Sequence, residues 1–219
     1  MLVSRSEEDG GMKVTVIGGG STYTPELVSG FIRFHEVFPI TELALMDIDA
    51  ERLEVVGAFA QRMVAAQGSP FAVTLHTDRK AAVAGATYVT TQIRVGHMPA
   101  RREDEYLGRR WGLVGQETTG VGGMAKALRT IPVILDIASD IRETAPDALL
   151  LNFTNPAGLV TEALTRYAPD VKSVGVCNVG ITAKMMILEK LADMGQQISP
   201  ERAELDTLRL NHLTWNRGF

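Results

Sequence analysis

Residues 13–22 read Lys-Val-Thr-Val-Ile-Gly-Gly-Gly-Ser-Thr, an apolar, β-branched run that ends in three glycines. The run is too continuously apolar for a half-exposed strand, so it predicts a buried strand, and the apolar spacing at 25–34 predicts a helix after it. Glycines at this junction let the backbone turn sharply and approach a pyrophosphate, whose charge is stabilised by the N-terminus of the helix. The pattern favours a dinucleotide, held by Gly18, Gly19, Gly20, Ser21 and Thr22.

The turn departs from the full G-x-G-x-x-G pattern, because Tyr23 stands at the third glycine position. For the glycines alone, a strand-to-helix turn without a ligand stays an open alternative. Asp47 favours the cofactor, because it follows a second apolar run at 43–46, where a carboxylate can bind the ribose hydroxyls of NAD. Asp49 is better placed than Asp47 to cap the next helix. Since a carboxylate would also repel the 2′-phosphate of NADP, the sequence predicts NAD.

Strand-like and helix-like segments alternate along the chain. Strands are expected at 71–76, 88–93, 149–152, 174–177 and 208–212, and helices from 49, from 78, and over 124–144, 157–167 and 181–194. This alternation implies parallel strands joined by right-handed crossovers, and hence an α/β fold with a doubly wound, Rossmann-like parallel sheet. We expect a disordered extension at 1–12, the NAD-binding domain at 13–195, and the start of a truncated second α+β domain at 196–219.

Polar residues gather where the expected strands end, which is where ligands of such sheets bind. They are Asp47, Arg94, Asn152, Asn155, Cys177 and Asn178. Residues 95–123 interrupt the alternation, are rich in Arg, Glu, Asp and Gly, and predict a long loop that is functional or disordered. Arg94 and Arg101 could bind a phosphate or carboxylate through paired N–H groups, the alternative being a solvated, charged surface.

Composition bounds the class of protein. The chain has 219 residues, of which 45% are hydrophobic and 22% charged, a balance typical of soluble globular proteins. A formal net charge of -4 argues mildly against a nucleic-acid partner. The first residues lack the basic start and apolar core of a secretory signal, and no apolar run approaches the roughly 18 residues of a membrane span. We therefore expect a cytoplasmic protein without a membrane partner.

The single cysteine, Cys177, excludes an intramolecular disulfide framework. Cys177 and His212 are the one plausible pair of soft metal ligands, but a small buried thiol and a hydrogen-bonded structural histidine are the commoner roles of such residues. Two ligands so far apart, without C-x-x-C or H-x-x-x-H spacing, predict no metal by spacing. From its residues alone, the chain is expected to be an NAD-dependent enzyme of unknown substrate.

Six short segments, spread from about residue 13 to 219, belong together. They are Val-Ile-Gly-Gly-Gly-Ser at 16–21, Arg-Val-Gly at 94–96, Gly-Gln-Glu-Thr at 115–118, Asn-Phe-Thr-Asn-Pro-Ala-Gly at 152–158, Val-Cys-Asn at 176–178 and Leu-Asn-His-Leu-Thr-Trp at 210–215. In this order they resemble glycoside hydrolase family 4, the NAD- and metal-dependent glycosidases. In that family NAD oxidises C3 of the sugar, a base removes the C2 proton, the aglycone is eliminated, water adds to C1 and the ketone is reduced again.

The resemblance implies a metal site and a substrate. Cys177 and His212 would bind a divalent cation, typically manganese, which holds the C2 and C3 oxygens of a sugar phosphate. Asn178 stands where phospho-α-glucosidases carry an aspartate, so the chain resembles the 6-phospho-β-glucosidase branch. Gly180 departs from that branch, which usually has proline there. The substrate contacts implied by matching positions are Arg101, Glu117, Asn155 and Asn178.

The resemblance places the family's catalytic-base tyrosine beyond residue 219, so the catalytic base is unknown and the 219-residue chain alone is expected to be inactive. It also implies a homodimer or homotetramer. Two other functions stay open. One is an NAD-dependent 2-hydroxy-acid dehydrogenase of the malate or lactate type, although its histidine has no convincing place here. The other is a non-catalytic NAD-binding remnant.

Overall fold

The computed structural model describes residues 11–210 and 212–217. Its centre is a six-stranded parallel sheet in the order β3-β2-β1-β4-β5-β6, which confirms the predicted doubly wound topology. The strands are β1 (Met12–Ile17), β2 (Ile40–Met46), β3 (Ala72–His76), β4 (Tyr88–Thr91), β5 (Leu149–Asn152) and β6 (Ser173–Gly175). Of the predicted extension at 1–12, residues 1–10 lie outside the described part, and Met12 already belongs to β1.

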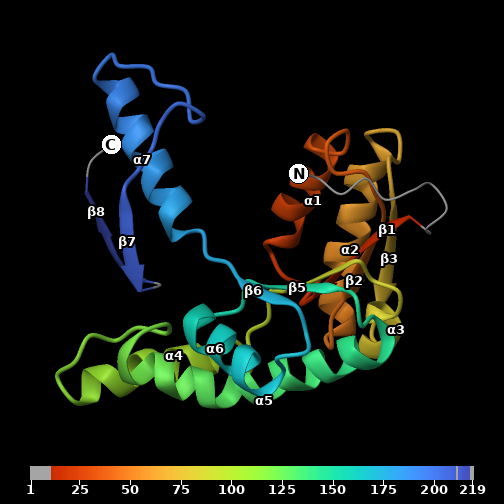
Figure 1. Cartoon of the computed structure of the whole chain (residues 1–219), viewed down its shortest axis with the longest axis horizontal. Helices are drawn as coiled ribbons and strands as arrows, with labels where there is room; N and C mark the ends of the chain where they lie inside the picture. The colour runs from red at the N-terminus through yellow and green to blue at the C-terminus, as the bar shows by residue number, and fades with distance from the viewer. Residues whose placement is uncertain (1–10, 211, 218–219) are drawn as a thin grey trace.

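Helices cover both faces of the sheet (Figure 1). They are α1 (Thr24–Arg33), α2 (Ala50–Ala65), α3 (Arg79–Val83), α5 (Gly120–Thr144) and α6 (Ala157–Tyr167). α1 and α2 pack on one face around the fully buried Val28, Leu43 and Leu45. α3, α5 and α6 pack on the other around Ile137 and Leu150. Since both faces are closed by apolar packing, the ends of the strands are left for a ligand.

Side-chain caps explain where two helices begin. Asp49 Oδ1 accepts the Arg52 N–H at 3.1 Å at the start of α2, and Asp78 Oδ1 accepts the Ala81 N–H at 2.8 Å at the start of α3. Both helix starts agree with the sequence prediction. Because Asp49 caps α2, the carboxylate of Asp47 is free for another role.

The prediction of a long loop at 95–123 is wrong. α4 (His97–Arg110) fills its first half, and α5 begins at Gly120. α4 carries too few apolar residues for a helical period to appear, and its charges instead form ion pairs. Two glycines of the segment serve close packing: a Cβ on Gly115 would lie 2.3 Å from the Glu105 carbonyl oxygen, and one on Gly122 would lie 2.1 Å from that of Gln116.

After β6 the chain leaves the sheet (Figure 1). The predicted helix at 181–194 is α7 (Val179–Asp193), which extends away from the sheet toward a hairpin of β7 (Thr207–Leu210) and β8 (Leu213–Asn216). The hairpin corrects the single strand predicted at 208–212, because Leu210 pairs with Leu213 on an antiparallel strand; residue 211 lies outside the described part. No helix of the described ranges has the length and hydropathy needed to cross a membrane.

Candidate functional site

The glycine turn after β1 is bound to the end of β2. The N–H groups of Gly18 and Gly19 both donate to the Met46 carbonyl oxygen, at 2.9 and 2.7 Å. Gly18 has a φ of +97°, and a Cβ on Gly19 would lie 2.8 Å from Leu45 Cβ. The glycines are therefore required by the turn's own conformation and by its contact with the neighbouring strand. The glycines would therefore be needed in this turn even without a bound dinucleotide.

Asp47 joins the turn to the end of β2. Its Oδ2 accepts the Gly20 N–H at 2.9 Å and its Oδ1 accepts the Asp49 N–H at 3.0 Å, while Arg52 Nη2 donates to the Gly20 carbonyl oxygen at 3.2 Å. The carboxylate is half-buried, and each oxygen keeps a further lone pair. The structure thus brings together the predicted turn and the predicted ribose acid, and also gives the acid a part in holding the turn.

The outer part of the turn is more open. Ser21 is half-buried and its Oγ accepts the Tyr23 N–H at 3.2 Å, whereas Thr22 is exposed. Within the described ranges, the Thr22 N–H donates to no protein group. Two side chains support the turn: Thr24 Oγ1 donates to Gly19 O at 2.8 Å, and Gln92 Nε2 donates to Gly18 O at 3.1 Å. Gln92 was not predicted from the sequence.

The segment after β5 is hydrogen-bonded to the end of β4. Thr91 Oγ1 donates to Asn152 Oδ1 at 2.8 Å, Asn152 Nδ2 donates to Thr154 O at 3.1 Å, and the Ile93 N–H donates to Thr154 Oγ1 at 3.0 Å. Asn152 is fully buried, so its role is structural. Asn155 is half-buried, and its Oδ1 makes one long contact of 3.4 Å with the Ala157 N–H, which leaves its amide able to bind a ligand.

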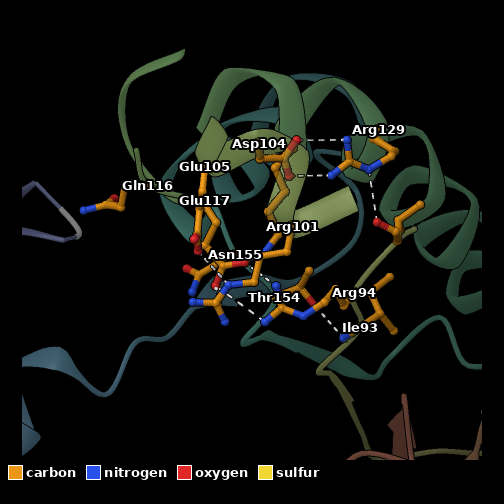
Figure 2. A network of polar contacts seen from close by, with 12 residues as sticks. Ile93, Arg94, Arg101, Asp104, Glu105, Gln116, Glu117, Arg129, Thr154 and Asn155 are labelled. Atoms are coloured by element: carbon orange, nitrogen blue, oxygen red, sulfur yellow. Dashed lines mark hydrogen bonds and ion pairs between the residues drawn. The ribbon is translucent and has the colours of Figure 1, made fainter. Parts of the chain in front are cut away.

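Glu117 is the centre of a charged cluster formed by three elements (Figure 2). Arg94, from the segment after β4, makes a short hydrogen bond to Glu117 Oε2, and Lys126 Nζ of α5 donates to the same oxygen at 2.9 Å. Arg101 of α4 lies 3.7 Å from Glu117 Oε1 and donates to Glu105 at 2.9 Å. Two predicted residues, Arg101 and Glu117, are thus brought together, and Figure 2 draws Asn155 in the same region of the view.

Burial and ion pairing act against each other in this cluster. Burial alone would raise the pKa of Glu117, but the hydrogen bonds from Arg94 and Lys126 lower it to about 2. Burial lowers the pKa of Lys126, and Glu117 opposes that shift. Hydrogen bonding to Glu105 raises the pKa of Arg101. Glu117 is therefore a carboxylate throughout the neutral range, with two guanidinium groups beside it.

A second ion pair fixes α4 on α5. Arg129 donates from both Nη atoms to Asp104, at 3.2 and 2.6 Å, and from Nε to the Val95 carbonyl oxygen at 3.0 Å (Figure 2). Asp104 is only 3% exposed. Neither this pair nor Lys126 was predicted. One signal was available, because Lys126 and Arg129 fall on the face of α5 that also carries the small residues Gly122, Gly123 and Ala127.

The proposed metal ligands lie on separate elements. Cys177 is free and half-exposed, and follows β6 together with the exposed Asn178, while His212 lies between β7 and β8. In the part of the chain that the structure describes, no group of three or more His, Cys, Asp or Glu side chains is placed to hold a metal ion. The cation site therefore stays a prediction with two protein ligands.

Comparison with known proteins gives one family. A model described as "Family 4 glycosyl hydrolase" matches residues 13–194. A protein named probable 6-phospho-beta-glucosidase from Bacillus subtilis (strain 168) is 49% identical over 94% of this chain and 46% of its own length. The 6-phospho-beta-glucosidase of Escherichia coli (strain K12) is 43% identical over 93% of this chain and 45% of its own. The chain thus spans about half the length of the curated relatives it matches.

A solved structure agrees with these matches. The 6-phospho-beta glucosidase from Thermotoga maritima, determined with manganese, NAD+ and glucose-6-phosphate, superimposes with a TM-score of 0.84 at 38% identity. The match covers 94% of this chain and 48% of that one.

Proposed function

This chain belongs to family 4 of the glycosyl hydrolases, and from that membership we propose that it acts in the hydrolysis of 6-phospho-β-glucosides with NAD and a divalent cation. The observation that carries the proposal is the position of two sites at one edge of the sheet. One is the glycine turn with Asp47, and the other is the cluster around Glu117. The match over residues 13–194 supports this function over that of a 2-hydroxy-acid dehydrogenase.

The turn after β1 fits a dinucleotide. It is held close to β2, its Thr22 N–H has no protein acceptor in the described ranges, and Asp47 keeps lone pairs beside it. We expect the pyrophosphate to lie on the turn and the adenosine ribose to bind Asp47. NAD held there would supply the hydride acceptor for oxidation of the sugar. The residues assigned to this cofactor are Gly18, Gly19, Gly20, Ser21, Thr22 and Asp47.

Cys177 and His212 are the proposed protein ligands of the cation. A free thiol and an imidazole are good donors for a divalent transition metal, and two protein donors leave coordination positions for sugar oxygens. Sulfur does not by itself favour manganese, so manganese is proposed from the Thermotoga maritima structure. The cation would supply Lewis-acid stabilisation of negative charge on the sugar oxygens.

Arg101, Glu117, Asn155 and Asn178 are the proposed substrate contacts. A guanidinium group donates paired hydrogen bonds to phosphate or hydroxyl oxygens, and the ionised Glu117 can accept from a sugar hydroxyl. The amide of Asn178 can bind a sugar but cannot act as a proton-donating acid. This fits a β-linked substrate with a better leaving group or a different acid.

The proposal is tested by titrating the 219-residue chain with NAD, MnCl2 and glucose 6-phosphate, and by assaying cleavage of p-nitrophenyl 6-phospho-β-glucoside. We expect NAD binding and manganese-dependent binding of the sugar phosphate. We expect no turnover at normal rates, because the resemblance places the base tyrosine beyond residue 219. Binding of NAD alone, indifferent to manganese, would support a non-catalytic NAD-binding protein. Cleavage at normal rates would refute the expected inactivity.

Cys177→Ser distinguishes the binding of the cation from the binding of NAD. The variant should lose manganese-dependent stabilisation in a thermal melt while NAD affinity stays nearly unchanged, because the thiol follows β6 and the NAD turn follows β1. Equal loss of both would identify Cys177 as a structural residue. A cytoplasmic location and a homodimer or homotetramer also stay predictions.

A further inference from the structure

Lys126 is a buried lysine in the second turn of α5. Its side chain is 4% exposed, and in the described part of the chain its Nζ has one hydrogen-bond partner, Glu117, at 2.9 Å. Lysine is almost never buried this deeply unless it is paired. A buried ion pair adds little stability over well-packed apolar residues, so stability alone does not account for this one.

The other partners of Glu117 differ from Lys126 in their exposure. The side chains of Arg94 and Arg101 are 32% and 36% exposed, whereas that of Glu117 is 13% exposed. Lys126 therefore holds the carboxylate from the protein interior, and the two arginines meet it from the side open to solvent. A ligand can reach the guanidinium groups but has no access to the ammonium group.

This arrangement makes Lys126 the counter-charge that a ligand cannot remove. When the oxygens of an anionic ligand take N–H groups of Arg94 and Arg101, the Arg94 donors are partly withdrawn from Glu117 and the ion pair of Arg101 with Glu117 is weakened. Lys126 keeps the carboxylate paired, so Glu117 can stay ionised and continue to orient both guanidinium groups. The charged groups that face the cluster are Arg94, Arg101 with Glu105, and Lys126, and Tyr23 faces Arg101.

We propose that Lys126 is a positioning residue: from the interior it fixes the Glu117 carboxylate, and through Glu117 it orients Arg94 and Arg101 for the oxygens of a sugar phosphate. The identity of the ligand rests on the proposed function. The link from Lys126 through Glu117 to the arginines rests on the contacts within this chain alone.

The test replaces the ammonium group by an apolar end of similar length, Lys126→Met. The matched control is Lys80→Met, because Lys80 also pairs with a carboxylate of α5, Glu143 at 2.6 Å, but at an exposed place far along the helix. The first readout needs no ligand and is the NMR titration of the Glu117 side-chain carboxyl. We expect its pKa to rise in Lys126→Met and to be unchanged in Lys80→Met.

The second readout is the affinity for glucose 6-phosphate, measured by calorimetry with NAD and MnCl2 between pH 5 and 8. The ratio of variant to wild-type affinity cancels the titration of the phosphate itself. For Lys126→Met we expect a loss of about tenfold or more, because the two guanidinium groups lose a carboxylate held in place. The loss should grow toward the acid end of the range, as the raised pKa of Glu117 brings this carboxyl nearer to protonation. A merely structural role would give a ratio that is flat with pH, and a flat ratio with an unchanged Glu117 titration would overturn the proposal.

Two further outcomes keep the experiment decisive. If Lys126→Met does not fold, the double variant Glu117→Gln/Lys126→Met takes its place in the experiment. It removes both members of the ion pair and so leaves neither of their charges buried without a partner. In this variant the Nη–Hη NMR signals of Arg94 should exchange with solvent faster than in the wild type, because Nη1 and Nη2 lose their charged acceptor on Glu117, and unchanged signals would overturn the proposal. If the wild type binds no glucose 6-phosphate, the proposed function fails, while the ligand-free readouts still decide the role of Lys126.

Discussion

The glycine turn and the Glu117 cluster lie at the same edge of the sheet but are built differently. The turn is made of backbone groups at the ends of adjacent strands, where Gly18 and Gly19 donate to Met46 and Gly20 donates to Asp47. The cluster is made of charged side chains from three elements that meet only after α4 has packed on α5. The turn is therefore specified by local sequence, and the cluster by tertiary packing.

The difference has an energetic consequence. In the turn, the ionised partner is the half-buried Asp47, so its loss leaves no charge deep inside the protein. In the Glu117 cluster and in the Arg129–Asp104 pair, a lost partner leaves a charge inside the protein, because Lys126 and Asp104 are each only 3% exposed. Charges without partners are far more costly in the interior than at the surface. Removal of one charged partner in the interior should therefore destabilise the chain more than removal of the Asp47 charge in the turn.

Arg129→Met should have the largest effect. It leaves the buried carboxylate of Asp104 without its bidentate partner, and we expect the free energy of unfolding to fall by about 3–5 kcal/mol. Urea denaturation followed by circular dichroism measures it. The control is Arg142→Met on the same helix, whose partner Asp170 is exposed, and it should leave the urea midpoint unchanged. Equal effects of the two variants would contradict the contrast between interior and surface.

The second largest effect on stability should come from acid, which protonates Glu117 and weakens its ion pairs. The pKa of Glu117 lies at about 2 in the folded chain, below the ordinary value of 4.5. The stabilisation from this shift is therefore complete above about pH 4.5 and is lost as the pH falls through about 2, a total of about 3 kcal/mol. Comparison of Glu117→Gln with the wild type across this window isolates the effect. A stability difference that stays constant with pH would show that Glu117 does not titrate as inferred.

Gly122→Ala should have a smaller effect, of about 1–3 kcal/mol, because the new Cβ would lie 2.1 Å from the Gln116 carbonyl oxygen and the backbone must move. Gly30→Ala in α1, the helix after the glycine turn, has open space around the new Cβ and should stabilise the chain by roughly 0.5–1 kcal/mol. Thermal melts of both variants measure the opposite signs. A stabilising Gly122→Ala would mean that the segment before α5 is not packed as closely as described.

The same contrast explains how far the sequence could predict the structure. β1, the turn and the cap of α2 by Asp49 were predictable, because apolar runs, glycines and a capping acid act on their immediate neighbours. α4 was missed because its charges are satisfied by α5, which no local pattern reveals. Lys126 was missed because a lysine on a helix is ordinarily solvated, and its burial follows from tertiary packing that no local pattern reveals.

The residues of the candidate site also differ in whether local sequence could predict them. The residues assigned to NAD follow from a turn that the structure confirms as a close backbone junction with Asp47 beside it. Arg101, Glu117 and Asn155 came from the resemblance, and no spacing rule would have placed Arg101 beside Glu117. Cys177 and His212 stay a prediction, since two ligands on separate elements need the fold around them to be brought into contact.

Asp47→Asn should destabilise the chain less than the substitutions of interior charges, and it tests the two roles of Asp47 separately. The amide oxygen can still accept the Gly20 N–H at the present 2.9 Å, but the second acceptor and the charge are lost, so we expect a destabilisation of about 1 kcal/mol. NAD affinity should weaken more, by roughly 1–3 kcal/mol, because the ribose hydroxyls lose a charge-assisted acceptor. The control is Asp49→Asn, which retains the cap of α2 and should leave both the stability and the NAD affinity unchanged. If Asp47→Asn lowers stability yet binds NAD as the wild type does, the carboxylate serves the turn alone. The ribose would then have to be recognised by backbone groups of the turn.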